Sequence, residues 1–450
     1  MKKITLPEEY SRTLRLAIPV TLSQAGQLVV QLVDNAMVGR LGATPLAGVA
    51  FGGTMIFFLF IFGMGIALGS TPLIGEMFAQ GRHRISASYL QNSVLLYLLV
   101  GIGIFCLQWA AIPLLHHLGQ PREVVEAAIP YYKYLMWSMI PFMLFSAFKQ
   151  FLEGVGNTRV AMAIIILSNL INVLFNWLLI YGKCGFPAMG AAGAGLATLI
   201  SRICTPILII AYFLHNPSFR RYLAFCNLRG FSVARIRSLL EVGLPISAQM
   251  TLEGGVFAIT GVMMGWISTV ALAANQIAIV MSNTAFMIVL SIASATTIRV
   301  SHAYGVNDPA AIRRIASSSY RIGLVWNSFT ILVFVLLRHW LPMVFTADAE
   351  VIRTTANLLI FVALFQISDG LQCISVGILR GMQDVRATVV IAFISYVVIN
   401  FLVGYICAFV FGFGPEGLWL GYIFGLSIAA YLLNRRYRRL IARTEGAIRS

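Results

Sequence analysis

The sequence carries very little charge for its length. Only 11% of its 450 residues are charged, whereas an average soluble domain has about 25%. Acidic residues are the scarcest, with 16 Asp and Glu against 32 Lys and Arg, while 59% of the chain is hydrophobic. So few charges cannot cover a globule of this size in water. This excludes a soluble protein and indicates that a lipid bilayer covers most of the surface.

Signatures of soluble chemistry are also missing. The six cysteines form no CxxC pair, the six histidines lie in or near predicted loops, and no GxxxxGK[ST] nucleotide-binding motif is present. We therefore expect no enzyme, no cofactor, no metal beyond a transported ion, and no ATP hydrolysis. The net charge of +16 does not indicate nucleic-acid binding, because the basic residues sit between apolar segments as loop charges.

Long apolar runs are abundant. Many approach or exceed the roughly 20 residues that cross a bilayer, and they are continuously apolar, not alternating as in a membrane β-barrel. The fold class is therefore an all-α membrane protein of about twelve transmembrane helices. The predicted spans are 13–38, 48–75, 90–115, 130–152, 160–181, 188–213, 237–266, 272–298, 320–342, 354–378, 386–411 and 414–434.

The basic residues indicate how the chain is oriented. If the N-terminus is inside, 25 of the 32 Lys and Arg fall in inside segments, 6 fall in outside segments, and Arg202 lies within a span. Cytoplasmic loops carry the excess of Lys and Arg in membrane proteins. We therefore predict a multi-pass protein with both termini in the cytoplasm. The first 20 residues, which lack a signal-peptide cleavage site, are interpreted as a cytoplasmic cap.

The two halves of the chain resemble each other. Residues 16–50 align with residues 242–276 at an offset of 226, so that Pro19 meets Pro245. Further along, LEGVGNTR in the first half aligns with LRGMQDVR in the second at nearly the same offset. An even number of spans in each half gives both halves the same orientation. The sequence therefore predicts two parallel six-helix repeats.

These repeats define the expected domains. We predict an N-terminal lobe at 1–214, a basic cytoplasmic linker at 215–236 and a C-terminal lobe at 237–450. Transporters with such repeats bind substrate between the halves and alternate access by rocking one half against the other. The alternative is a duplication that merely enlarged the bundle.

Three carboxylates lie inside the apolar runs, at Asp34, Glu253 and Asp369. A charge at the bilayer centre costs roughly 2.5–3.5 kcal/mol on insertion scales, so such residues usually face a cavity and mark ion paths. A carboxylate can exchange a proton, or it can coordinate a hard cation beside amide and hydroxyl oxygens. The three carboxylates are therefore compatible with either H⁺ or Na⁺ as the coupling ion. They would also attract organic cations.

Amide side chains share helical faces with these acids. Such stripes are either interhelical hydrogen bonds or the wall of a water-lined cavity, and both interpretations stay open for single residues. The candidates for the substrate cavity are Gln24, Gln27 and Gln31 of the first span, Gln249 of the seventh, Gln276 and Asn283 of the eighth, and Gln366 of the tenth. Asn169, Asn172 and Asn176 form a further stripe in the fifth span.

Taken in order, these segments resemble the multidrug and toxic compound extrusion (MATE) family, in its NorM-like branch. The resemblance covers nearly the whole chain. Its clearest motifs are VDNAMVGRLG at 33–42, NVLFNWLLIYGKCG at 172–185, GAGLAT at 193–198, AANQ at 273–276 and LRG at 379–381. It implies a V-shaped, two-lobed antiporter of the bacterial inner membrane that exports small amphipathic organic cations in exchange for Na⁺ or H⁺. The two-lobed design requires no partner chain, so a monomer is expected.

The resemblance also implies roles for individual residues. Glu253 and Asp369 correspond to the cation site of the C-terminal lobe. Asp34 corresponds to the acid of the N-terminal lobe, with Asn172, Asn176 and Thr198 around it. The DinF-like branch tends to have Asp where this chain has Asn176, and this departure favours Na⁺ over H⁺.

The rival function is a flippase of lipid-linked precursors from the same wider superfamily. A flippase would need a basic cavity for a pyrophosphate head. The intramembrane charges of this chain are mainly acidic, with Arg202 the exception, which argues against it.

Overall fold

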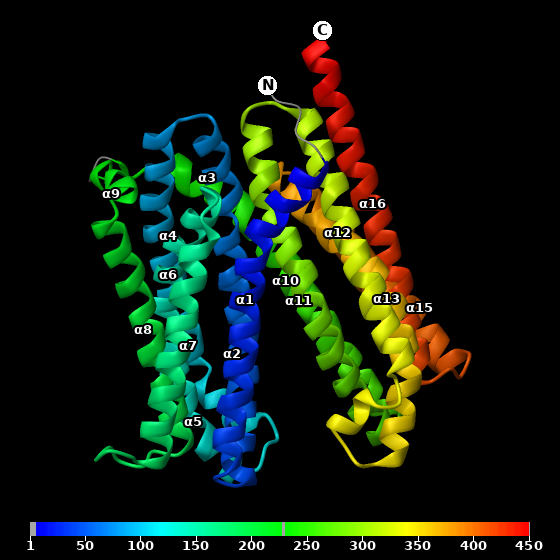
Figure 1. Cartoon of the computed structure of the whole chain (residues 1–450). Coiled ribbons are helices and arrows are strands. Elements are labelled where there is room, and N and C mark those ends of the chain that lie inside the picture. Colours follow the sequence, from blue (N-terminus) through cyan, green and yellow to red (C-terminus); the bar gives the residue numbers. More distant parts are fainter. Residues whose placement is uncertain (1–5, 227–229, 450) are drawn as a thin grey trace. The chain divides into compact units, whose positions relative to one another are not determined.

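Twelve helices of the computed structural model are long and apolar enough to cross a membrane (Figure 1). The structure describes residues 6–226 and 230–449, and every regular element in these ranges is helical. This confirms the twelve predicted spans and the all-α fold class. The helices extend beyond most of the apolar runs, because polar residues continue a helix past the hydrocarbon region.

Residues 6–224 contain ten helical elements, of which all except η1 and α9 belong to the first six spans. The second span is divided at Gly69 and the fourth at Ser138. The elements are α1 (Leu6–Gly39), α2 (Ala43–Leu68), α3 (Ser70–Ala79), α4 (His83–Ala110), η1 (Ile112–His117), α5 (Arg122–Trp137), α6 (Met139–Gly154), α7 (Thr158–Tyr181), α8 (Ala191–His215) and α9 (Pro217–Ala224).

The last six spans are longer on average than the first six. The eleventh span of the chain contains two π-helical segments. The elements are α10 (Val233–Ile267), α11 (Thr269–Gly305), α12 (Pro309–Leu336), η3 (Leu341–Val344), α13 (Ala349–Gly381), α14 (Val385–Ala392), η4 (Phe393–Ile399), α15 (Asn400–Tyr405), η5 (Ile406–Val410) and α16 (Pro415–Arg449). The π-helical segments are η4 and η5.

The ninth span shows why helix ends are hard to predict. The apolar run predicts 320–342, but α12 begins at Pro309 and ends at Leu336. The Asp308 Oδ1 atom accepts a hydrogen bond from the Ala311 N–H at 2.8 Å, and Pro309 suits the first helical turn. These predicted ends were wrong because local capping, not hydropathy, decides where this helix starts.

Residues 19–247 form one compact unit, called here the first unit. Within it α7 packs along α8, α2 along α5, and α4 along α6. The short helix α9 lies inside the stretch predicted as a linker. Its Tyr222 is 2% exposed, stacks edge-on against Phe151 and hydrogen-bonds through its hydroxyl to His83 Nδ1 at 3.0 Å. This part of the predicted linker is therefore helical and packed.

Residues 1–18 and 248–450 form the other compact unit, called here the second unit. Its central helix is α13, which packs against α11, α12 and α16 (Figure 1). Phe365, Trp419 and Tyr422 form a buried aromatic cluster at the contact between α13 and α16. The boundaries of the two units fall inside α1 and α10, whereas the sequence predicts lobes that meet in the linker at 215–236.

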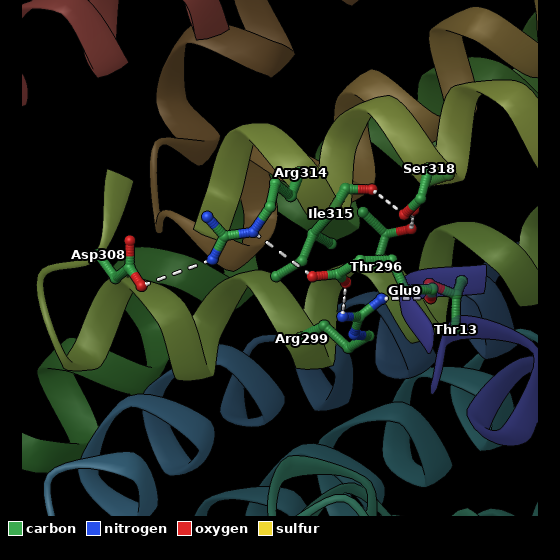
Figure 2. Close-up of polar contacts among 9 residues, drawn as sticks. Glu9, Thr13, Thr296, Arg299, Asp308, Arg314, Ile315 and Ser318 are labelled. Carbon is green, nitrogen blue, oxygen red and sulfur yellow. Dashed lines mark hydrogen bonds and ion pairs between the residues drawn. The ribbon is translucent and has the colours of Figure 1, made fainter. Parts of the chain in front are cut away.

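The start of α1 is tied into the second unit by an ion-pair cluster (Figure 2). Glu9 is only 2% exposed and accepts hydrogen bonds from Arg299, whose Nη1 atom also donates to Thr13 Oγ1 at 2.6 Å. Arg314 lies 3.6 Å from the same carboxylate and 3.9 Å from Asp308. The sequence predicts Glu9 to lie in the N-terminal cap, before the first span. In the structure it belongs to α1 and is buried, because two arginines from α11 and α12 neutralise its charge.

Candidate cation sites

In the first unit, Asp34 belongs to a chain of amide hydrogen bonds. The Asn176 Nδ2 atom donates to Asp34 Oδ1 and, at 3.1 Å, to Asn172 Oδ1. The Asn172 Nδ2 atom donates in turn to Thr198 Oγ1 at 3.3 Å. Helices α1, α7 and α8 each supply part of this cluster. The structure thus brings together the four residues that the resemblance assigns to the N-terminal lobe.

Oxygen atoms dominate the Asp34 cluster. Asn176 is fully buried, and its Oδ1 atom has no hydrogen-bond partner among the residues that the structure describes. Buried polar atoms are nearly always satisfied, so each unsatisfied acceptor requires an explanation such as a bound ion or water. A carboxylate with amide and hydroxyl oxygens around it is a ligand set that suits a hard cation.

In the second unit, two carboxylates from different helices lie close enough to interact electrostatically. They are Glu253 of α10, which is half-buried, and Asp369 of α13, which is 5% exposed. Within the described ranges neither carboxylate has a hydrogen-bond partner. Two like charges in surroundings of low polarity repel strongly, so a proton or a cation that reduces their combined charge stabilises the pair. The pair can therefore hold an exchangeable cation.

Sequence reasoning missed two neighbours of this pair. It predicts Arg380 to be a loop charge, which is wrong. Arg380 lies in the last turn of α13, donates to Gln249 Oε1 at 3.2 Å and interacts electrostatically with Glu253. The spacing in the sequence could have revealed Arg380. It follows Asp369 by 11 residues, about three helical turns, so both side chains lie on the same face of a helix.

The second missed neighbour is Tyr396, which lies in the π-helical segment η4. It is 2% exposed and lies near Glu253 and Asp369. Its hydroxyl has no hydrogen-bond partner in the described part of the chain. Nothing in an apolar run marks one tyrosine out, and a π-helical turn shifts the side chains that follow it. Short π-helical segments are frequent at functional sites.

The amide residues predicted to line a cavity differ in their surroundings. Gln249 and Gln366 are buried; Gln366 donates from Nε2 to Ser282 Oγ at 3.3 Å, so it contributes an interhelical hydrogen bond. Gln24 is half-buried, whereas the side chains of Gln27, Gln31, Gln276 and Asn283 are exposed on their own units. A role of these seven residues in a substrate cavity stays a prediction.

Arg202 is a basic residue in the sixth span, within the first unit. Its guanidinium lies over the rings of Phe60 and Phe142, 5.3 and 5.2 Å from their centroids, and its Nη1 atom donates to Ser138 Oγ at 2.8 Å. Cation–π contacts stabilise a desolvated guanidinium. Arg202 is thereby held by packing at the break between α5 and α6.

Twelve apolar helices in a duplicated chain, three of which carry a carboxylate well inside their apolar stretch, are typical of a multi-pass membrane transporter. The sequence model of the MatE family matches this chain twice, at residues 19–178 and 245–406. The two matches begin at Pro19 and Pro245, the offset of the internal repeat. The chain belongs to the MATE family.

Relatives and solved structures agree with this assignment. The chain is 34% identical over 445 residues to the "Probable multidrug resistance protein NorM" of Bradyrhizobium diazoefficiens, covering 98% of this chain and 96% of the relative. It is 30% identical to the "Multidrug resistance protein NorM" of Photobacterium profundum, covering 96% and 95%.

Among solved structures, an outward-facing "multidrug resistance MATE family transporter of the MOP superfamily" matches with a TM-score of 0.89 and 21% identity, covering 97% of each chain. At that identity the match shows the fold alone. Since the family consists of transporters, the chain is a transport protein and not an enzyme.

Proposed function

We propose that the chain is a cation-coupled multidrug antiporter of the bacterial inner membrane that exports small amphipathic organic cations as a monomer. The observation that supports this most strongly is the pair formed by Glu253 and Asp369. These two carboxylates lie in two apolar spans and have no hydrogen-bond partner among the described residues, so they can exchange a cation. The relatives named as multidrug resistance proteins support the substrate class.

The proposed cycle couples the ion to the drug through the two repeats. Substrate binds from the cytoplasmic side between the lobes. A cation then enters from outside, binds Glu253 and Asp369 and also the Asp34 cluster, and the change between inward and outward access releases the drug. Such coupling requires that the ion and the drug prefer different conformations of the protein. The oxygen-rich surroundings of Asp34 favour Na⁺ over H⁺ as the coupling ion.

Transport by the purified protein in liposomes tests this proposal when Na⁺ and pH gradients are imposed separately. We expect an Na⁺ gradient to drive movement of a fluorescent organic cation. Asp369→Asn and Glu253→Gln should abolish transport driven by the ion gradient while the protein stays inserted, because an uncharged amide cannot replace the carboxylate that holds the coupling cation. Glu241→Gln is the matched control, since Glu241 lies on α10 and forms an exposed pair with Arg237.

Each outcome separates the candidates. Transport that a pH gradient drives and an Na⁺ gradient does not would replace Na⁺ with H⁺. Transport that survives both carboxylate substitutions would contradict the assigned site. Scrambling of lipids without any response to ion gradients would favour the flippase.

A further inference from the structure

A cavity of about 770 Å³ lies in the second unit between α13 and α16. Its α13 side consists of Ser368, Leu371 and Ser375, which follow one face of that helix at steps of three and four residues. Asp369 lies on a different face of α13, so the cavity is not part of the carboxylate pair. Its volume falls in the range of about 300–1,000 Å³ that is typical of small-molecule sites.

Hydrogen bonds between hydroxyl groups hold together the helices that line this cavity. Ser368 and Ser427 join α13 to α16 through a hydrogen bond of 2.6 Å between their hydroxyls. The hydroxyl of Tyr320, from α12, lies 2.7 Å from Ser375 Oγ and accepts from Asn434 Nδ2 at 3.3 Å. Three helices are therefore cross-linked behind the cavity, and these contacts fix its width.

The mouth of the cavity is strongly basic. Arg435, Arg438 and Arg439 line it from consecutive turns of α16, and all three are exposed. In the described part of the chain none of the three forms an ion pair. By contrast, Arg436 points to another face of the same helix and forms two hydrogen bonds with Asp384, at 2.7 and 3.2 Å.

Acidic residues are thus available nearby but do not neutralise these three arginines. Glu445, one turn beyond the cavity, pairs with Arg313 of α12 at 2.8 Å. A positive charge excess on cytoplasmic segments explains why arginines occur at the end of α16. It does not explain why three of them converge on one cavity whose wall also carries the hydroxyls of Ser368, Ser375 and Ser427.

The chemistry of the cavity selects an anion with an apolar portion. An organic cation, the proposed cargo, would be repelled by three guanidinium groups. Guanidinium groups bind phosphate through paired N–H donors, and basic pockets between membrane helices on the cytoplasmic side bind anionic lipid head groups. Leu371, Ala430 and Ala442 supply apolar surface beside the arginines, and Tyr431 is 65% exposed at the same wall.

We propose that the cavity between α13 and α16 binds one anionic phospholipid, with its phosphate on Arg435, Arg438 and Arg439 and an acyl chain along Leu371 and Ala430. Under the predicted orientation this lipid belongs to the cytoplasmic leaflet. The site holds the lipid independently of cation exchange at Glu253 and Asp369.

Native mass spectrometry of the purified protein, exchanged into phosphatidylglycerol, phosphatidylethanolamine or inorganic phosphate, tests the proposal. We expect one phosphatidylglycerol to remain bound and phosphatidylethanolamine to be lost. A triple variant with Arg435→Gln, Arg438→Gln and Arg439→Gln should bind phosphatidylglycerol about 100-fold more weakly, since each arginine near an anionic head group contributes roughly a factor of five.

A matched triple variant removes the same charge elsewhere. Arg82, Arg159 and Arg220 are exposed, fall on the same predicted side and lie in the first unit, away from the cavity. Their replacement by Gln should leave the lipid bound. Ala442→Trp keeps every charge and fills the mouth, so it should also release the lipid and does not depend on the folding of the triple variant.

Three results would overturn the proposal. The first is equal loss of lipid from both triple variants, which would mean that net charge alone attracts it. The second is retention of phosphatidylglycerol by Ala442→Trp. The third is binding of inorganic phosphate as tight as that of the lipid, which would make the cavity a site for free anions.

Discussion

At the scale of single residues, four acids that lie within helices, Glu9, Asp34, Glu253 and Asp369, fall into two chemical kinds. Glu9 accepts hydrogen bonds from Arg299 and lies beside Arg314, so its charge is fully compensated by the protein. Glu253 and Asp369 instead interact with each other electrostatically, and Asp34 accepts a hydrogen bond from an amide N–H. The charge of Glu9 is balanced by two arginines, whereas Glu253 and Asp369 together carry two negative charges against the single Arg380, and no basic residue hydrogen-bonds to Asp34 within the described ranges. Glu9 is accordingly structural.

Glu9→Gln should destabilise the second unit. Removing one partner of a buried ion pair leaves an uncompensated charge, here the largely buried Arg299, and costs about 3 kcal/mol or more. We expect a lower melting temperature of the purified protein in detergent, with the Na⁺ response of transport retained in liposomes. The melting temperature is measured by heating samples of the protein and quantifying the folded fraction that remains by size-exclusion chromatography.

The control for Glu9 is an exposed pair. Arg122 and Glu126 form a contact at 2.7 Å with 88% and 56% of their side chains exposed. Such pairs contribute about 0–1 kcal/mol, so Glu126→Gln should leave the melting temperature nearly unchanged. Equal melting temperatures for wild type and Glu9→Gln would contradict the structural role of this cluster.

Residues of the sites could be predicted only where their surroundings are visible in the sequence. Asp34, Glu253 and Asp369 stand out because apolar residues flank them on both sides. Glu9 could not be recognised, because its arginine partners lie about 290 residues away on other helices. Tyr396 depends on a π-helical turn that no apolar pattern reveals.

At the scale of helices, the sequence does not reveal where the backbones of two helices come into close contact. Twelve spans follow from hydropathy, but hydropathy does not say which helices touch. Between the eleventh and twelfth spans, a Cβ atom added to Gly421 would lie 2.5 Å from the Asn400 carbonyl oxygen and 2.8 Å from Gly404 Cα. Small residues allow such contacts between membrane helices, where packing and not the hydrophobic effect holds helices together.

Gly421→Ala should therefore separate two helices that now touch. The added methyl group meets backbone atoms, which cannot rotate away as a flexible side chain could. Overpacking of this kind costs about 1–3 kcal/mol, so we expect a lower melting temperature. Because η4 belongs to the same span and carries Tyr396, transport driven by an Na⁺ gradient should also fall.

A glycine without close neighbours is the control. Gly261 lies within α10, and a Cβ atom there would have nothing within 4 Å. Alanine favours helix over glycine by up to about 1 kcal/mol, so Gly261→Ala should keep or raise the melting temperature. If both glycine variants melted alike, the contact between α15 and α16 would not be tight.

At the scale of the whole molecule, the duplication is preserved in the helices but not in the acids. In each half the fourth span is the most buried of the six. At the offset where Pro19 meets Pro245, however, Glu253 corresponds to Gln27, and Asp34 corresponds to Thr260. The second unit thus carries two carboxylates that interact, and the first carries one with amides around it. The two repeats have diverged into chemically different sites.

The predicted orientation of the chain can be tested with a native cysteine. Cys184 is exposed in the loop between α7 and α8, which the distribution of Lys and Arg places outside the cell. A membrane-impermeant maleimide should therefore modify Cys184 in intact cells, and mass spectrometry can map the modified residue. Arg220→Cys, in the predicted cytoplasmic segment, should react only after the membrane is opened, and Cys184→Ser removes the first signal. Reaction of Arg220→Cys in intact cells, with Cys184 protected, would reverse the assigned orientation and move the basic mouth at α16 to the outer leaflet.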